Sequence, residues 1–159
     1  MYLLGLLFIY CVAYVVLFFG ISLFFTNSLP RLKCRSIISI GLIIAFYFSV
    51  LIISSLIPDL EWSNRILHTF GGGFLIVLVT FLATKDSGTK INAFQFFIVG
   101  ISAGALFGVA NEIFEFILQN RFGFIFANSI NDTWLDLISN TIGSIFASLF
   151  MAPFIKVKK

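Results

Sequence analysis

Long uncharged apolar segments place the strongest constraint on how this chain folds. The first of them, Leu3–Phe25, carries no charged side chain. A run of about 20 apolar residues is long enough for a helix to cross the hydrocarbon core of a bilayer, which is roughly 30 Å thick. Since 60% of the residues are hydrophobic and only 11% are charged, against about 25% charged in soluble domains, the sequence predicts an integral membrane protein.

The distribution of apolar segments predicts an all-α bundle of about five transmembrane helices, forming one domain over residues 1–159. The expected helices cover residues 3–25, 37–57, 66–84, 94–118 and 134–154. The first has no basic segment before it and is longer than the core of a signal peptide, so we expect it to be retained. The segment after Pro58, with Trp62, suits the membrane interface. Residues 119–133 are expected to form a semi-polar connection.

The basic residues predict the orientation of the bundle. Cytoplasmic loops of membrane proteins carry an excess of Lys and Arg. With five helices, eight of the ten basic residues fall on one side, and only Arg65 and Arg121 fall on the other. The sequence therefore predicts a multi-pass protein of the inner (plasma) membrane with the N-terminus outside and the C-terminus in the cytoplasm. Six of the seven acidic residues fall on the outer side, and Asp86 is the exception.

Five ionisable side chains converge at the predicted outer ends of three helices. They lie near the start of the third helix, the end of the fourth and the start of the fifth: His68, Glu112, Glu115, Asp132 and Asp136. At about 1.5 Å per residue, all five are expected within roughly 10 Å of the outer interface. Ionisable groups inside a membrane are costly and usually serve a function. The sequence therefore predicts one polar site at the outer leaflet.

Rows of small residues lead into this site. Each row places one residue per turn on the same helix face, with an acidic residue at its predicted outer end. The two rows are Gly100, Gly104, Gly108 and Glu112 on the fourth helix, and Asp136, Asn140, Gly143 and Ala147 on the fifth. Small residues let neighbouring membrane helices approach closely. We therefore expect the rows to hold the acids against a partner helix and away from lipid.

One histidine with several carboxylates is a suitable ligand set for Mg²⁺, Mn²⁺, Ca²⁺ or Zn²⁺. The candidate cofactor is therefore a divalent metal, and its candidate ligands are His68, Glu112, Asp132 and Asp136. Such a metal would neutralise the charge of a phosphorylated substrate. Alternatively, the clustered acids serve as general acid and base, and the candidate catalytic residues are then Glu112, Glu115, Asp136 and His68.

Non-catalytic interpretations of the same residues remain open at the level of sequence. The acids form a structural network neutralised by Arg65 or Arg121, or Asp132 caps the N-terminus of the fifth helix, where Asn, Asp and Thr are favoured. The HExxH and P-loop motifs do not occur in the sequence. The net charge of +3 does not indicate nucleic-acid binding, because the basic residues lie in loops and in the tail.

Three motifs resemble those of known bacterial membrane proteins. HTFGGGF, NEIFEF and NDTWLDLISNTIGS resemble the YjdF-like inner-membrane proteins and, more distantly, the VanZ-like family associated with glycopeptide resistance. The resemblance covers residues 59–147, roughly, and implies a shared membrane fold and a shared polar site. The matching positions are His68, Glu112, Glu115, Asp132, Asp136, Asn140 and Gly143. VanZ-like proteins have Asp-Lys before the His, where this chain has Asn64 and Arg65.

The expected function follows from the predicted position of the site. An outer-leaflet site of His, Glu and Asp, with or without a metal, suits a protein that acts on or senses envelope lipids or lipid-linked precursors. The expected partners are thus membrane lipids and a lipid-linked substrate. The alternative is a non-catalytic structural or partner-binding protein, such as a VanZ-like accessory protein. A transporter is less favoured, because ion pathways also need polar groups at mid-membrane and on the cytoplasmic side.

Overall fold

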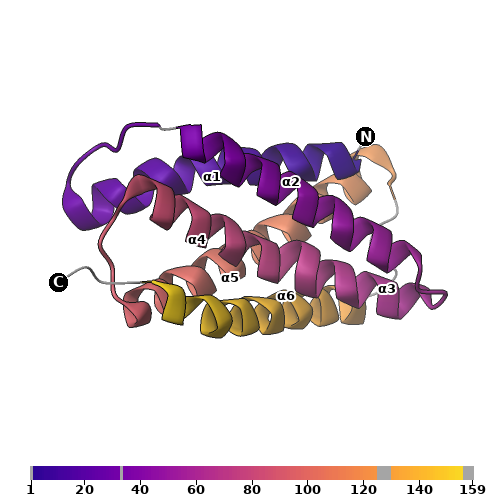
Figure 1. The fold of residues 1–159 in the computed structure, drawn as a ribbon. Helices are drawn as coiled ribbons and strands as arrows, with labels where there is room; N and C mark the ends of the chain where they lie inside the picture. Colours follow the sequence, from indigo (N-terminus) through magenta and orange to yellow (C-terminus); the bar gives the residue numbers. More distant parts are fainter. Residues whose placement is uncertain (1, 33, 125–129, 156–159) are drawn as a thin grey trace.

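The computed structural model describes residues 2–32, 34–124 and 130–155, and this part of the chain contains helices and no strands (Figure 1). The elements are α1 (Tyr2–Thr26), α2 (Cys34–Ser55), α3 (Leu60–Ile66), the π-helix η1 (Leu67–Phe74), α4 (Leu75–Ser87), α5 (Ala93–Phe122), α6 (Ile130–Met151) and the 3₁₀-helix η2 (Ala152–Phe154). α3, η1 and α4 follow one another without a break. Five helical segments of 22 to 30 residues are long and apolar enough to cross a membrane. The predicted all-helical class and the predicted number of spans are confirmed.

Three predicted boundaries are wrong by a turn or more. The third helix was expected to start at residue 66, but the segment with Trp62 already forms α3. It starts at Leu60, where the Asp59 carboxylate accepts a hydrogen bond from the Trp62 backbone N–H at 3.0 Å. α5 continues to Phe122 and ends at Gly123, which adopts a left-handed conformation that a glycine accommodates without strain. α6 already begins at Ile130. The predicted 119–133 connection is therefore helical at both ends, and its residues 125–129 lie outside the described residues.

α4 lies at the centre of the bundle. It packs against α1, α2, α5 and α6. Its side chains are buried around much of its circumference, and Leu75, Ile76, Val77 and Val79 are fully buried. Two threonines on this helix, Thr80 and Thr84, donate their hydroxyls to carbonyls of their own helix at 2.8 Å. This satisfies the hydroxyls without a partner from another helix, so they can stay in an apolar core.

The outer surfaces of the other helices are apolar. Large hydrophobic side chains are widely exposed, including Phe8, Phe24, Ile37 and Phe146. A soluble protein rarely exposes so much contiguous apolar surface, whereas lipid chains cover it without cost. The exposure pattern thus agrees with the five candidate spans.

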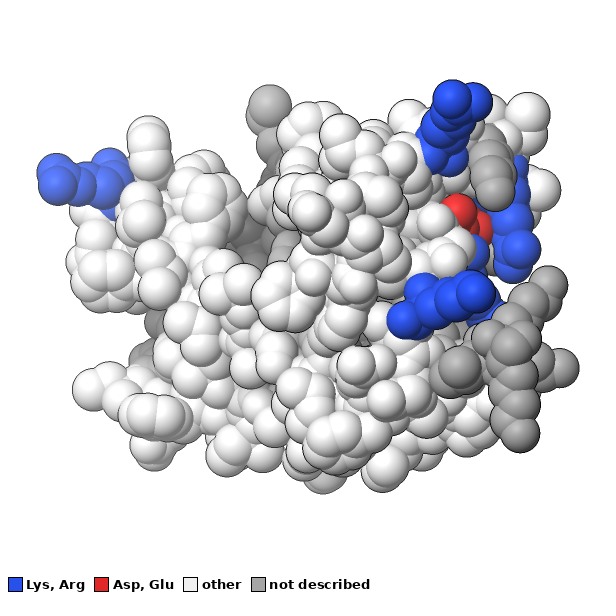
Figure 2. All heavy atoms as spheres, turned by 90° about the vertical axis from the view of Figure 1, so that its left-hand side faces the viewer, with Lys and Arg blue, Asp and Glu red and all other residues white. Residues whose placement is uncertain are grey.

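The described basic residues separate to the two ends of the bundle. The chain starts α1 at one end and finishes η2 at the other (Figure 1). Arg31, Arg35, Lys85 and Lys90 belong to the α1–α2 and α4–α5 connections and to the adjoining helix ends. Figure 2 shows this end of the molecule, where Lys and Arg side chains gather. Lys33, Lys156, Lys158 and Lys159, which the orientation argument also uses, lie outside the described residues.

A buried carboxylate joins three helices at this basic end. Asp86 on α4 accepts hydrogen bonds from the Tyr14 hydroxyl on α1 at 2.7 Å and from the Ser39 hydroxyl on α2 at 2.5 Å. Its other oxygen lies 3.1 Å from Nε of Arg35, and its side chain is 1% exposed. Asp86, the acidic residue that the sequence did not place on the outer side, thus has three side-chain partners. We call this group the Asp86 cluster.

Candidate functional site

The glycine row of α5 packs directly on α6. A Cβ added at Gly108 would lie 3.2 Å from the Asn140 Cβ, and one added at Gly100 would lie 2.6 Å from the Ser148 hydroxyl. Between them, Gly104 faces the Ser144 hydroxyl. The two helices are therefore antiparallel and meet at every turn. One turn further along this register, Glu112 of α5 comes opposite Asp136 of α6. The sequence predicted that each row meets a partner helix, and the structure shows that the two rows meet each other.

η1 meets α6 through backbone contacts. A Cβ added at Gly73 would collide with the carbonyl oxygen of Asn140, and one added at Gly143 would collide with the carbonyl oxygen of Thr69. Glycines are therefore required on both sides of this crossing. The crossing places His68, on the first turn of η1, beside Asp136, with Nε2 and Oδ1 3.2 Å apart. π-helical segments often occur at functional sites.

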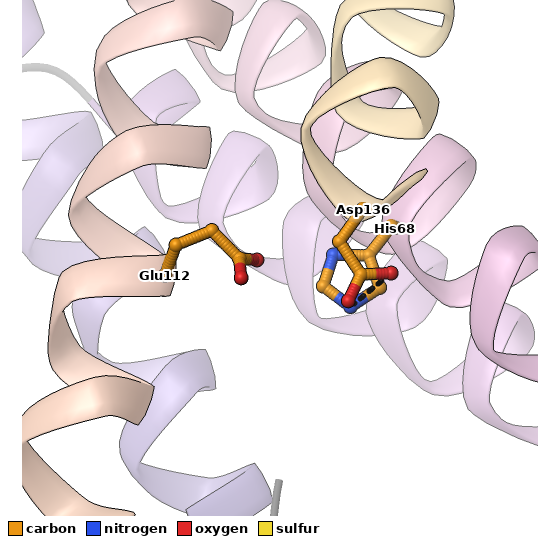
Figure 3. Close-up of side chains that lie close together, drawn as sticks. All are labelled: His68, Glu112 and Asp136. Carbon is orange, nitrogen blue, oxygen red and sulfur yellow. Dashed lines mark ion pairs between the residues drawn. The ribbon is translucent and has the colours of Figure 1, made fainter. Parts of the chain in front are cut away.

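His68, Glu112 and Asp136 come together from three different elements. Each offers one candidate ligand atom, and these atoms lie within 4.8 Å of one another. Figure 3 shows Glu112 pointing from α5 toward the His68–Asp136 pair. Glu112 is 9% exposed, and its Oε1 is buried with no hydrogen-bond partner among the described residues. We call these three residues the triad.

Arg65 lies beside the triad and pairs with two acids. Its two terminal nitrogens contact the carboxylates of Asp132 and Asp136. Asn64 donates to Asp136 Oδ1 at 3.1 Å. Asp132 was predicted both as a metal ligand and as an N-cap, but it lies inside the first turn of α6 and binds Arg65. Of the two arginines expected to neutralise the acids, Arg65 does so, whereas Arg121 is exposed near the end of α5.

A cavity of about 170 Å³ opens beside the triad. Its polar wall includes His68, Asp136 and Glu115, the last of which accepts a hydrogen bond from Asn111 Nδ2 at 2.9 Å. Its apolar wall comes from α1, α2 and α5 and includes Leu6, Tyr10, Tyr47, Leu51 and Phe107. We call this the site cavity. One side suits a charged group and the other suits hydrocarbon.

A comparison with family models identifies the chain. Residues 3–156 match the model of a family described as predicted membrane protein (DUF2238). The chain belongs to this family. The match includes the first helix and ends at Lys156, the first residue of the basic tail, so it extends beyond the three motifs at both ends. No curated protein and no solved structure matches the chain.

In this DUF2238 member, the donor set of the triad fits a divalent cation. Zn²⁺ binds imidazole nitrogens and carboxylate oxygens at about 2.0 to 2.2 Å, and Ca²⁺ binds oxygens at about 2.3 to 2.6 Å. Ligand atoms within 4.8 Å of one another are therefore close to the span of one coordination sphere. The unpartnered Oε1 of Glu112 would gain a partner. Oδ1 of Asp136 already faces Arg65, Asn64 and His68, which leaves Oδ2 as its oxygen for a cation.

The second ring nitrogen of His68 lies next to Asn140. The distance between His68 Nδ1 and Asn140 Nδ2 is 3.2 Å. In the hydrogen-bonded state, Nδ1 accepts from the amide and Nε2 donates to Asp136, because a neutral ring has one donor and one acceptor. If the side-chain amide of Asn140 rotated by 180°, its oxygen would accept a hydrogen bond from Nδ1–H of His68. Nε2 of His68 would then carry no proton and could bind a metal. Metal-binding histidines are commonly held in this way by a partner on the other nitrogen.

His68 and Glu112 lie farther from the ends of their helices than predicted. His68 follows the start of α3 at Leu60 by eight residues, about 12 Å at 1.5 Å per residue. Glu112 precedes the end of α5 at Phe122 by ten residues, about 15 Å. The prediction of roughly 10 Å placed His68 in the first turn of a helix, which is wrong because α3 precedes it. A deeper position increases the cost of unbalanced charge.

The sequence did not identify Asn64, Tyr10 and Tyr47 as site residues. Asn64 lies four residues before His68 and therefore on the same helix face, a spacing that would have shown it if α3 had been recognised as helical. Tyr10 and Tyr47 are buried aromatic residues of α1 and α2. Their position beside the cavity depends on how α1 and α2 pack, which no short-range spacing reveals.

Proposed function

We propose that the triad binds a divalent cation and, through it, the phosphorylated headgroup of an envelope lipid or lipid-linked precursor at the outer leaflet of the inner membrane. The metal would neutralise phosphate charge as a Lewis acid. His68, Glu112 and Asp136 hold the cation. Glu115, on the wall of the site cavity, stands where a carboxylate can accept a proton from a bound headgroup or water.

The charge balance of the buried site carries this proposal. Glu112, Asp132 and Asp136 converge on a single described cation, Arg65. Arg65 and Asp136 are nearly buried, with side-chain exposures of 13% and 3%. Burying a charge without a partner of opposite charge costs several kcal/mol per ion in proteins. With Glu115 of the cavity wall, four carboxylates surround one arginine, and a divalent cation at the triad would balance two of the three remaining negative charges.

The two-sided cavity supports a lipid as the ligand. Its polar wall faces the triad, and its apolar wall is made of tyrosine, leucine and phenylalanine side chains from three helices. A soluble metabolite would leave the apolar wall without a partner. The separation of the described basic residues supports the outer leaflet, because the triad lies toward the end opposite Arg31, Arg35, Lys85 and Lys90.

A non-catalytic network is the second candidate. The observation that favours it is the double contact of Arg65 with Asp132 and Asp136, which ties α3 to α6. In that case the triad would be structural or would bind a protein partner, as in a VanZ-like accessory role. A transporter ranks third, because the carboxylate at the other end, Asp86, is fully engaged by neighbouring side chains.

Metal analysis of purified protein separates the first two candidates. The protein in detergent is loaded with Mn²⁺ or Zn²⁺, desalted and analysed for metal, and its thermal unfolding is followed with and without the ion. We expect about one equivalent of metal and a rise in stability of about 2.7 kcal/mol at an ion concentration 100 times Kd. Glu112→Gln should abolish both, whereas Glu61→Gln, at an exposed position on α3, should not.

The opposite pattern would support the structural network. In that case the metal content would be equal in wild type and Glu112→Gln, and the substitution would lower thermal stability whether or not the ion is present.

A further inference from the structure

Two openings lie between α1 and α5. The first is the site cavity, whose walls include Tyr10 of α1 and Phe107 of α5. The second is a groove of about 570 Å³ further along the same two helices, lined by Leu17 and Phe24 on one side and Ala103 on the other. We call it the α1–α5 groove. The polar site and the groove therefore share both of their flanking helices.

Side chains alone bridge α1 and α5 between the two openings. In the described part of the chain, no Cα atom of α1 lies within 8 Å of a Cα atom of α5. The rings of Tyr10 and Phe107 stack with their centroids 6.5 Å apart and their planes at 16°. Phe107 is one helical turn from Ala103 in the groove. Between α1 and α5, the site cavity and the groove are therefore separated by side chains such as this stacked pair, and not by close backbone packing.

The groove is suited to hydrocarbon. Of its ten lining residues, only Gln95 and Ser102 have polar side chains. From Leu6 in the cavity to Phe25 in the groove, α1 advances 19 residues, or about 28 Å. That approaches the whole hydrocarbon thickness of roughly 30 Å, whereas one leaflet accounts for about 15 Å of it. The near end of the groove, Leu17, lies 11 residues from Leu6, or about 16 Å. An ordinary diacyl lipid with its headgroup at the cavity would therefore reach this near end and leave the far end, at Phe25, unfilled.

We infer that the ligand is a long-chain isoprenoid phosphate, with its phosphate at the triad and its single chain running past the Tyr10–Phe107 pair into the α1–α5 groove. The inference rests on the proposed function and names its substrate class. Both ends of this ligand match the protein. Its phosphate is an anion for the metal-bearing triad, and its hydrocarbon chain is longer than one leaflet, as the groove requires.

Filling the groove tests the position of the chain. Ser102 is exposed and lines the groove, so Ser102→Trp adds bulk toward lipid rather than in the core. Ala105 is exposed on the same helix but does not line the groove, which makes Ala105→Trp the matched control. Full-length protein in nanodiscs with Mn²⁺ is titrated with a long-chain polyprenyl monophosphate, the matching polyprenol, or phosphatidylglycerol, and bound lipid is counted by native mass spectrometry.

We expect the polyprenyl monophosphate to bind in preference to both other lipids. Ser102→Trp should weaken its binding at least tenfold, and Ala105→Trp should leave it unchanged. Thermal unfolding of both variants shows that they are folded. Preferential binding of phosphatidylglycerol, or equal binding of polyprenyl monophosphate to both tryptophan variants, would overturn the inference.

Metal content, measured on the same samples, separates this inference from the proposed function. If metal binds and Ser102→Trp has no effect on lipid binding, the groove inference fails and the metal site stands. If no metal binds but Ser102→Trp still blocks the isoprenoid chain, the groove assignment stands and the proposed metal-dependent function fails. Glu112→Gln should reduce polyprenyl monophosphate binding to the level of polyprenol, because only the phosphate contact is lost.

Discussion

At the scale of single residues, Arg65 makes the acidic site compatible with burial. Its planar guanidinium has two terminal nitrogens, and each contacts a different carboxylate of α6. A lysine carries the same charge but is a point donor without the fork geometry. Arg65 therefore both lowers the net charge around the triad and fixes the position of Asp136 relative to His68.

Arg65→Met should strongly destabilise the protein. Removing one partner of a buried ion pair leaves the other charge uncompensated and typically costs about 3 to 5 kcal/mol. Thermal and denaturant unfolding in detergent measure the loss, and Arg121→Met, at an exposed position, should change stability by less than about 0.5 kcal/mol. If the triad binds a cation, added Mn²⁺ should restore part of the stability of Arg65→Met. Equal losses for the two variants would contradict the role assigned to Arg65.

The sequence predicted which residues cluster at the site more accurately than it predicted which side chains pair with one another. His68, Glu112 and Asp136 could be placed together because ionisable groups avoid lipid and because the helix count puts them at one end. The N-cap role of Asp132 was wrong, since it depends on where α6 begins, and a shift of four residues turns an N-cap into a first-turn residue. Pairings between side chains depend on helix rotation, which composition does not determine.

At the scale of helices, the η1–α6 crossing determines the geometry of the site. Gly73 and Gly143 face backbone atoms of the opposing segment, so a methyl group cannot be placed there without separating the helices. The apolar segment located the third helix but missed its start, because Glu61, Asn64 and Arg65 give α3 the composition of a loop. The π-helical geometry of residues 67–74 has no simple sequence signal beyond the glycine run.

Gly73→Ala should destabilise the bundle and disturb the triad. The added Cβ collides with the Asn140 carbonyl, and overpacking of this kind costs about 1 to 3 kcal/mol. Gly41→Ala is the matched control, because a Cβ there meets nothing within 4 Å and alanine is favoured over glycine in a helix by about 0.5 to 1 kcal/mol. Thermal unfolding and metal content are measured for both. Retention of full stability and metal by Gly73→Ala would show that the two backbones are not in tight contact.

At the scale of the whole molecule, polar groups hold the two ends of the bundle independently. The triad and Arg65 connect α3, η1, α5 and α6 at one end, whereas the Asp86 cluster connects α1, α2 and α4 at the other. The apolar core of α4 lies between them. A substitution at one end should therefore change the stability of the whole protein without changing the contacts or the ligand binding at the other end.

Asp86→Asn tests this independence. The amide loses the ion pair with Arg35 and cannot accept from Tyr14 and Ser39 with the same strength, so we expect a loss of about 1 to 3 kcal/mol. The stabilisation by Mn²⁺ or Zn²⁺ should stay as large as in wild type, because the triad is untouched. Asp59→Asn is the control, since Asn and Asp are equally good N-caps. A reduced metal content in Asp86→Asn would mean that the two ends are coupled.

The orientation of the bundle decides which leaflet supplies the ligand, and thiol labelling can determine it. Cys34 is exposed at the start of α2, and Cys11 is half-buried in the middle of α1. In a Cys11→Ser background, Cys34 reports on the basic end. In a chain without either native cysteine, Leu60→Cys reports on the opposite end, because Leu60 is 85% exposed at the start of α3.

A membrane-impermeant maleimide should label the two reporters in opposite preparations. If the positive-inside rule holds for this chain, Cys34 reacts in inverted vesicles and not in intact cells, whereas Leu60→Cys reacts in intact cells. The triad then opens toward the outer leaflet, where a lipid-linked precursor is exposed after it crosses the membrane. The reverse labelling pattern would place the same chemistry at the cytoplasmic leaflet. The ligand would then be a lipid that has not yet crossed the membrane. The α1–α5 groove would still lie toward the opposite leaflet, because it follows the site cavity along the same two helices.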